Sequence, residues 1–275
     1  MTLHVVYRSS AAENHKNRPD YYSKAIALAS VIDAAQHCQG DSVELIFLND
    51  GPIPADRAPL MRSAGEIVQI RRGSNRGSYL FAIKMASGRR WPADDLVLLA
   101  EDDYLYRADA LEQLARCARV HTGVDYFYPY AKVAEPRSWT PSQPQEWVPF
   151  PTTTSTFALR AAALAQDKHI LLAAPFTGGN WDHASLLAIQ GTQPFALRAV
   201  MRHPLRQRHH SALNSVARSA FLTVSKSAVN ALAWSHGLRV TRRALAASPP
   251  LATHLETGHI AWGTDWAERA NQLRA

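Results

Sequence analysis

The sequence predicts an α/β fold in which a doubly wound, mostly parallel sheet is flanked by helices. Two observations lead to this fold class. Short apolar runs alternate with segments of helical periodicity through the first 120 residues, which is typical of parallel sheets with crossover helices. The run from Leu96 to Ala100 then ends abruptly in three carboxylates, Glu101, Asp102 and Asp103. The carboxyl ends of strands are where open α/β sheets bind ligands.

The first 120 residues contain four predicted strands and three predicted helices. The strands are the short apolar runs, at residues 3–7, 43–48, 67–70 and 96–100. The helices repeat apolar residues at helical spacing: one is opened by Pro19, one covers about Tyr79 to Ser87 and one covers Ala108 to Val120. Polar or turn-forming residues follow each strand, near Ser9, Asp50, Gly73 and Glu101. These four loops are predicted to line the ligand-binding edge of the sheet.

The pattern is less regular after residue 120. Strands are predicted at residues 125–130 and 152–159, on either side of a loop rich in Pro, Ser and Trp. Helices are predicted at residues 161–173, 184–190 and about 214–238. The last of these is long, and we expect its apolar residues, Val224 and Val229 among them, to pack in the core. A boundary near residue 121 separates the regular half from this more variable half.

The composition describes a globular protein. The chain has 275 residues, 47% of them hydrophobic and 19% charged, which suits one large domain or two small ones. Its two cysteines, Cys38 and Cys117, lack CxxC spacing, so neither a disulfide framework nor a zinc site is indicated. No apolar run has the length of a membrane span and no signal-peptide pattern opens the chain. We therefore expect a cytoplasmic protein.

The net charge of +7 suggests an anionic partner. The basic residues form scattered clusters, at 71–72, 89–90, 206–210 and 242–243. Such patches suit phosphate groups or an anionic membrane surface. The cluster at 206–210 in particular could close over a diphosphate, contact lipid beside the long helix, or be a solvated loop. No nucleic-acid-binding module is recognisable, so nucleic acid is not an expected partner.

The acidic triplet at residues 101–103 requires compensation, because adjacent carboxylates repel one another. Hard divalent cations such as Mg²⁺ and Mn²⁺ prefer oxygen ligands and often bridge carboxylates to substrate phosphates. The triplet therefore predicts a metal site at the end of the strand. The alternative is a solvated acidic turn that precedes the next helix.

The order of these motifs resembles a GT-A-fold glycosyltransferase of the family-2-like kind. The resemblance rests on three segments, Asn49-Asp50-Gly51, Asn75-Arg76-Gly77-Ser78 and Glu101-Asp102-Asp103, each after a predicted strand. It covers residues 3–120 well and the rest loosely. It implies a GT-A-like, Rossmann-type sheet with a mixed C-terminal half. The chain would form one continuous domain, in which residues 1–120 bind a nucleotide-sugar and residues 121–275 form the acceptor-binding and C-terminal helical half.

The resemblance assigns substrate-binding roles to three residues of the first half. Asp50 would accept a hydrogen bond from the imide N–H of a base, while Asn75 and Gly77 would let the chain pass close to the nucleotide. Each has a simpler alternative. Asp50 is also a common turn residue that caps its own backbone, and Asn75 to Gly77 is also an ordinary helix start.

The resemblance also implies the metal ligands. Asp103 would bind Mn²⁺ or Mg²⁺ directly, and Glu101 or Asp102 would contact ribose or a metal-bound water. Many GT-A enzymes supply a late-chain histidine to the metal, and His254 is the first candidate here, with His259 as the second. An imidazole suits Mn²⁺ better than Mg²⁺. With 12 histidines in the chain, a surface histidine without a ligand role is the alternative.

A transferase that inverts the sugar needs a general base for the acceptor hydroxyl. Asp182 is the candidate, because it follows Gly178 and Gly179 and precedes a predicted helix. Inverting members of the family carry an acidic base at the start of a helix in this part of the chain. The alternatives are that Asp182 only caps the helix, or that His183 serves as the base.

The predicted function is a metal-dependent glycosyltransferase. It would move a sugar from a nucleotide diphosphate-sugar donor to a sugar, lipid-linked or small-molecule acceptor, with inversion at the anomeric carbon and Asp182 as the general base. One alternative is a GT-A-related nucleotidyltransferase, but the loop after the first strand, residues 8–13, has no glycine. The other alternative is a nucleotide- or carbohydrate-binding module without turnover. The sequence does not identify the sugar, the base or the acceptor.

Overall fold

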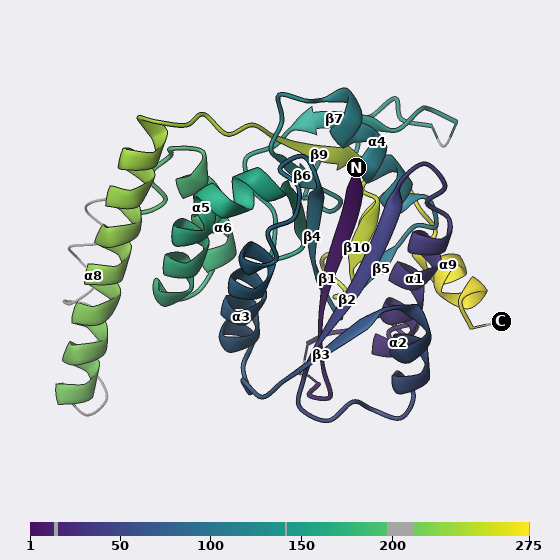
Figure 1. The fold of residues 1–275 in the computed structure, drawn as a ribbon, viewed down its shortest axis with the longest axis horizontal. Helices are drawn as coiled ribbons and strands as arrows, with labels where there is room; N and C mark the ends of the chain where they lie inside the picture. The colour runs from purple at the N-terminus through teal and green to yellow at the C-terminus, as the bar shows by residue number, and fades with distance from the viewer. Residues whose placement is uncertain (14–15, 141, 197–211, 275) are drawn as a thin grey trace. The chain divides into compact units, whose positions relative to one another are not determined.

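A computed structural model describes residues 1–13, 16–140, 142–196 and 212–274, with side chains from 217 onward in the last range. It contains a mixed sheet in the order β3-β2-β1-β4-β8-β6-β9-β7 and a small sheet of β10 and β5 (Figure 1). The strands are β1 (Thr2–Ser10), β2 (Ser42–Asp50), β3 (Glu66–Ile70), β4 (Leu96–Glu101), β5 (Tyr104–Tyr106), β6 (Tyr126–Tyr128), β7 (Glu146–Pro149), β8 (Phe157–Arg160), β9 (Ala244–Ser248) and β10 (Ala252–His254).

The described residues also form helices. They are α1 (Lys24–Gln36), α2 (Ala58–Ala64), α3 (Asn75–Gly88), α4 (Ala110–Val120), α5 (Ala161–Ala173), the short 3-10 helix η1 (Ala174–Phe176), α6 (Trp181–Ile189), α8 (Ala212–Gly237) and α9 (Trp266–Gln272). Strands β1 to β4 are parallel to one another, whereas β8 runs antiparallel to both β4 and β6. This arrangement confirms the predicted α/β class with a mostly parallel sheet flanked by helices.

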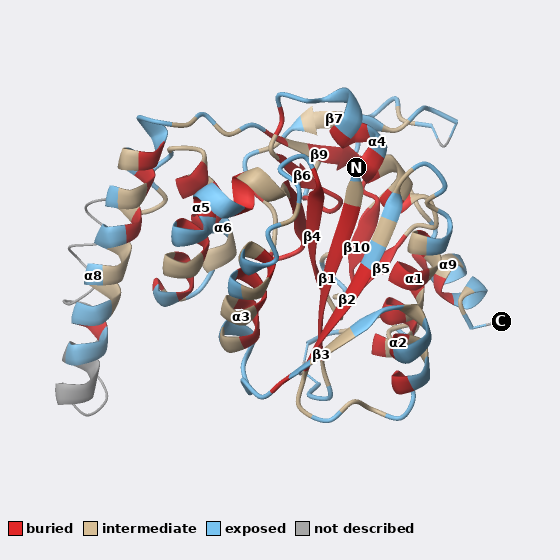
Figure 2. Ribbon diagram, viewed as in Figure 1, coloured by how far each residue is buried: buried red, intermediate tan, exposed pale blue. Residues whose placement is uncertain are grey.

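Strands β1 and β4 form the middle of the sheet and are buried over almost their whole length (Figure 2). Their side chains alternate between two faces. Val5 and Tyr7 belong to a core shared with Leu28 and Val31 of α1, while α3 packs against β1 and buries Tyr79 and Ile83. Because both faces are covered, these strands are continuous apolar runs rather than alternating ones.

The chain divides into two compact units. The first comprises Met1–Leu164 and Ala244–Ala275, and holds both sheets; the second, Ala165–Arg243, is helical. In the second unit α6 packs against α8, and the fully buried Asp167 receives two hydrogen bonds from Arg242, at 2.9 and 3.0 Å. None of the helices in the described part of the chain is both long and apolar enough to cross a membrane.

Two expectations about the elements were wrong, and several short elements were not anticipated. The first helix begins at Lys24 rather than at Pro19, because the Ser23 hydroxyl accepts the N–H of Ala25 and caps it there. The short elements α2, β5, β7, η1, β9, β10 and α9 were not predicted, since three to seven residues carry little periodicity. On α8, Val229 is buried as expected but Val224 is 68% exposed. The basic cluster at 206–210 lies outside the described residues.

Candidate functional site

The carboxyl ends of β1, β2 and β4 meet at one edge of the sheet. In the parallel register Ser10 lies beside Asp50, and Arg8 lies beside Glu101. Three of the four predicted ligand loops are therefore neighbours. The fourth joins them because the Gly73 N–H donates to Oδ1 of Asp50, at 3.1 Å.

Glu101 is held by Arg8, a buried cation from the adjacent strand. The Arg8 guanidinium forms an ion pair with the Glu101 carboxylate, and its Nη1 donates to Oδ1 of Asn75 at 2.7 Å and to the Ser78 hydroxyl at 3.2 Å. Arg8 is 5% exposed. Two of the predicted substrate-binding residues, Asn75 and Glu101, are thus joined through one guanidinium.

Asp102 is held by a second buried cation. Its Oδ2 accepts the N–H of Ser10 at 2.9 Å and lies 3.0 Å from Nζ of Lys24 and 3.8 Å from Arg57. Both basic side chains are almost fully buried. Burial raises the pKa of Asp102, and the Lys24 charge and the Ser10 hydrogen bond oppose that rise without cancelling it.

Asp103 contacts a residue 151 positions later in the chain. Its Oδ2 lies 3.1 Å from Nε2 of His254, 3.1 Å from Arg18 and 3.6 Å from Lys16. Burial alone would raise the pKa of Asp103. The hydrogen bond and charge of His254, together with the charges of Lys16 and Arg18, outweigh burial and hold its pKa well below the ordinary range. The two residues predicted as metal ligands, Asp103 and His254, are therefore in contact.

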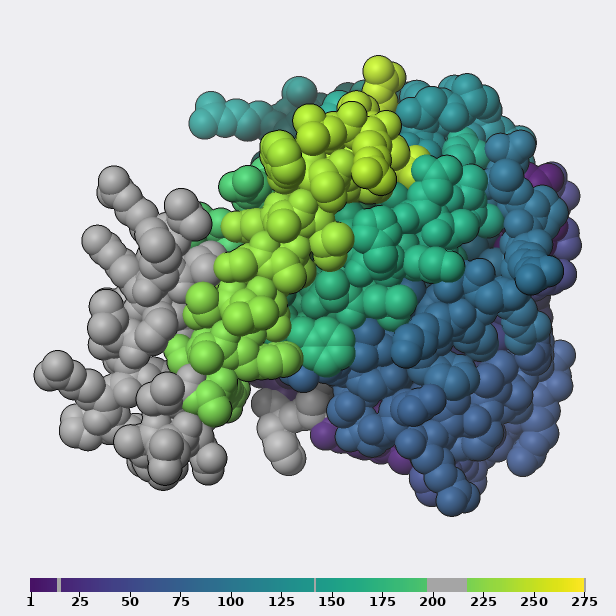
Figure 3. All heavy atoms as spheres, turned by 60° about the vertical axis from the view of Figure 1, so that its left-hand side comes forward, coloured from purple at the N-terminus to yellow at the C-terminus, as the bar shows by residue number. Residues whose placement is uncertain are grey.

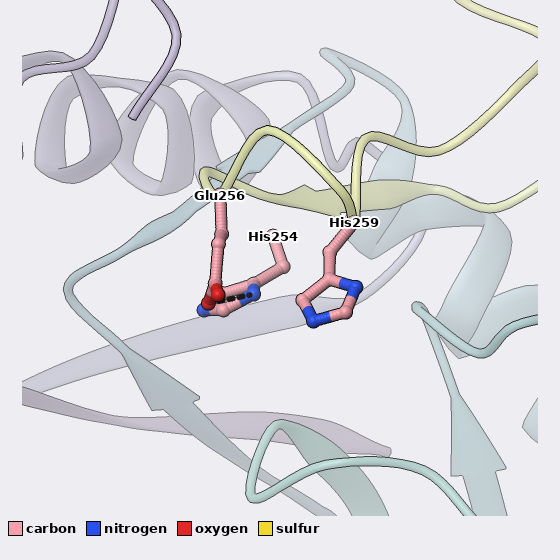
Figure 4. A group of neighbouring side chains, drawn as sticks. All are labelled: His254, Glu256 and His259. Carbon is pink, nitrogen blue, oxygen red and sulfur yellow. Dashed lines mark ion pairs between the residues drawn. The ribbon is translucent and has the colours of Figure 1, made fainter. Parts of the chain in front are cut away.

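His254 also belongs to a group of three donors, with Glu256 and His259 (Figure 4). One ligand atom from each lies within 4.8 Å of the others, and Nδ1 of His254 is 3.6 Å from the Glu256 carboxylate. Nδ1 of His259 is buried and has no hydrogen-bond partner among the described residues. A buried ring nitrogen without a partner calls for an explanation, and a bound cation would provide one.

These donors fit a divalent transition metal. The two imidazoles and the Glu256 carboxylate form a mixed nitrogen and oxygen set that suits Mn²⁺ better than Mg²⁺. Asp103 adjoins this set through its contact with Nε2 of His254. A cation at Asp103 would have to displace both of its basic partners, Lys16 and Arg18. The Lys16 side chain is 36% exposed and long enough to move aside, whereas that of Arg18 is 11% exposed. Glu101 and Asp102 are less available as metal ligands, because each is already paired with a buried basic side chain, Arg8 and Lys24 respectively.

Asp50 has one carboxylate oxygen engaged and one without a partner. Its Oδ1 accepts the N–H groups of Arg72 and Gly73, at 2.6 and 3.1 Å, which holds the loop after β3. Its Oδ2 has no hydrogen bond or ion pair to any described residue. Asp50 therefore stabilises a turn, as the alternative proposed, but the turn belongs to the neighbouring strand and one acceptor oxygen remains.

Contacts within the chain explain why residue 77 is a glycine. A Cβ on Gly77 would lie 2.9 Å from Cβ of Arg72 and 2.9 Å from the Ser74 hydroxyl. That hydroxyl caps α3 by accepting the Gly77 N–H. Close approach to a nucleotide is not needed to explain this glycine, and that role stays a prediction.

Asp182 lies in the first turn of α6, where it was expected. Its Oδ1 accepts the N–H of His183 at 2.9 Å. The N-cap residue is Asn180, in a left-handed conformation with φ 57°, and its side chain makes no capping hydrogen bond. Asp182 belongs to the second compact unit, and its role as a base stays a prediction.

The sequence interpretation missed the basic residues that hold the triplet. Arg8 was signalled by its position, directly before the polar end of the first strand. Lys24 was signalled less clearly, as a lone cation at the start of an apolar helix. Arg57 and Lys16 carry no local signal, because only the folded chain brings them to residues 102 and 103.

Comparison with known proteins gives weak similarities. No family model matches the chain, and no curated protein matches its sequence. Three solved structures share 13–15% identity with it: S. aureus TarS fragment 1–349, a CMP:2-keto-3-deoxy-manno-octonic acid synthetase complexed with CTP, and a mycobacterial protein. Their TM-scores are 0.45, 0.41 and 0.37, and they cover 68%, 68% and 66% of this chain.

The same matches cover 54%, 83% and 63% of the three known chains, so this chain spans about half of the TarS fragment. The similarity concerns the fold alone. Because the TM-scores are below 0.5, we draw no inference about substrate or activity from them.

Proposed function

We propose that the chain is a glycosyltransferase that moves a sugar from a nucleotide diphosphate-sugar to an acceptor hydroxyl or amine. The contact between Asp103 and His254 carries this proposal. Two residues 151 positions apart meet at the edge where β1, β2 and β4 end, which is where an open α/β sheet binds its ligand. A carboxylate and an imidazole in contact there are suited to hold Mn²⁺ or Mg²⁺ against a diphosphate.

The donor would be held by this chain's own polar groups. Oδ2 of Asp50 would accept an N–H from the nucleobase. Lys16 and Arg18, which contact Asp103, would supply positive charge to the anionic diphosphate. The buried pairs of Glu101 and Asp102 with Arg8 and Lys24 would keep the strand ends fixed during binding.

The metal would be held by Asp103 and His254, with Glu256 and His259 beside them. When bound there, a divalent cation neutralises the diphosphate and stabilises the charge that develops on the leaving nucleoside diphosphate. In the second unit, Asp182 would accept the proton of the acceptor hydroxyl as the hydroxyl attacks the anomeric carbon, which gives inversion.

The proposal is tested by ligand-induced stabilisation. We expect one nucleoside diphosphate or nucleotide-sugar to raise the melting temperature in the presence of Mn²⁺ and not in its absence. At a ligand concentration a hundredfold above its dissociation constant, the stabilisation should be about 2.7 kcal/mol. Asp103→Asn should abolish the Mn²⁺-dependent part and leave the circular dichroism spectrum unchanged.

Asp109→Asn is the matched control, because Asp109 is also an aspartate paired with an arginine, Arg107 at 2.7 Å, but lies at the start of α4. It should behave as wild type. Undiminished Mn²⁺-dependent binding by Asp103→Asn would contradict the metal assignment. No stabilisation by any nucleotide would contradict the transferase.

A further inference from the structure

The net positive charge of the chain comes from one acid-free segment. Residues 183–255 contain no Asp or Glu and nine Lys or Arg. The whole chain has 30 basic and 23 acidic residues, so the remainder has 21 of the first and 23 of the second. The excess of positive charge therefore comes from this segment, which includes the whole of α8.

Helix α8 has few charged residues on either of its faces. Its 26 residues contain two Lys or Arg, at 218 and 226, and no acidic residue. One face packs against the protein through Val229 and Ala233, which are fully buried. A helix that lies on the surface of a soluble protein normally has charged and polar residues on its outer face. On α8 the outer face has few.

The outer face carries a stripe of apolar residues. At 100° per residue, Val224 and Ala231 lie opposite Val229 and Ala233. Phe221 is 52% exposed, Val224 68%, Trp234 63%, and Leu238, just after the helix, 69%. Figures 2 and 3 show exposed positions recurring along α8 and the helix forming part of the molecular surface. We call this stripe the apolar face of α8; it consists of Phe221, Val224, Ala228, Ala231, Trp234 and Leu238.

We propose that the apolar face of α8 docks on a bilayer that contains anionic lipids. Apolar side chains on a surface helix would enter the boundary between headgroups and acyl chains. Trp234 suits this boundary, where its ring meets the apolar side and its N–H meets the polar side. The basic residues of the acid-free segment, Arg218 and Arg239 among those described, would add attraction to anionic headgroups. This inference does not depend on the proposed function.

Charge favours a bilayer over other occupants. A second copy of the chain would bring the same acid-free, basic segment against this face, and like charges would repel. A nucleic acid would match the charge but offers no apolar layer for Phe221, Val224 and Trp234. An anionic bilayer matches both properties. Since α8 does not qualify as a membrane span, it would lie along the surface.

The test is association of the full chain with vesicles. We expect binding to vesicles of phosphatidylcholine with roughly a third phosphatidylglycerol, and none to phosphatidylcholine alone. In about 1 M salt, where the Debye length is about 3 Å, binding should fall at least tenfold. Val224→Glu should lower the affinity at least tenfold, because a carboxylate would enter the apolar boundary. Arg239→Gln should lower it about fivefold.

Val120→Glu is the matched control. Val120 is 69% exposed, like Val224 at 68%, but lies at the end of α4 in the other unit. Its variant should bind as wild type does. Equal binding to both kinds of vesicle, no binding to either, or an equal loss in both variants would overturn the proposal. So would a dimer in light scattering that Val224→Glu dissociates without any vesicle binding, because the occupant would then be a second copy.

Discussion

Charged residues serve opposite purposes in two regions of this chain. At the sheet edge, each carboxylate of the triplet is paired with basic residues from distant segments, as Glu101 is with Arg8 and Asp102 with Lys24. In residues 183–255 there is no carboxylate at all. Where opposite charges are paired and buried, they fix a site in the fold. Where one sign prevails, as in this segment, the unpaired charges that reach the surface can attract a partner of opposite charge.

The largest effect is expected for a variant that impairs turnover and leaves donor binding intact. Asp182→Asn should lower transfer by about 10²–10⁴-fold, the usual contribution of a general base, and leave Mn²⁺-dependent donor binding near wild type. Initial rates of sugar transfer and thermal shifts with the donor measure the two quantities. The companion variant Asp103→Asn should instead lose Mn²⁺-dependent donor binding.

Asp182→Asn leaves the length and polarity of the side chain almost unchanged, so its first-turn position in α6 should survive. Transfer at the wild-type rate would reduce Asp182 to a residue that only caps its own helix turn. Loss of donor binding in this variant would assign Asp182 to the donor site instead.

The next effect concerns the paired charges themselves. Lys24→Met should destabilise the fold by about 3 kcal/mol at neutral pH, because the partly buried Asp102 loses its nearest cation. Burial already raises the pKa of Asp102, and without Lys24 it should rise further. A carboxyl whose folded pKa lies above its unfolded value costs stability when ionised. The deficit should therefore shrink as pH falls through that raised pKa.

Denaturant unfolding at about pH 7 and about pH 4 measures this deficit. Lys84→Met is the control, since Lys84 is exposed on α3 and its loss should change stability by less than about 0.5 kcal/mol. A deficit that grew as the pH fell would contradict the assigned role of Lys24.

The sequence predicted the sheet better than the site. Apolar runs such as Leu96–Ala100 located β1 to β4, because strands buried on both faces leave a strong local pattern. No such pattern located the short strands β5 and β10, yet their pairing brings His254 beside Asp103. The resemblance named both of those residues, while Lys24 and Arg57 appear only in the folded chain. Long-range ion pairs have no periodicity, so a pattern along the sequence cannot reveal them.

The smallest expected effect tests whether the helix start at the site is shaped by the protein or by a ligand. Gly77→Ala should destabilise the fold by about 1–3 kcal/mol, because its Cβ would meet Cβ of Arg72 and the capping hydroxyl of Ser74, each at 2.9 Å. A Cβ on Gly88, the last residue of the same helix, would meet nothing within 4 Å, so Gly88→Ala should be neutral or stabilising by up to about 1 kcal/mol. Urea unfolding of both variants without ligand measures the difference. If Gly77→Ala were as stable as Gly88→Ala and lost only nucleotide binding, the glycine would be there for the ligand.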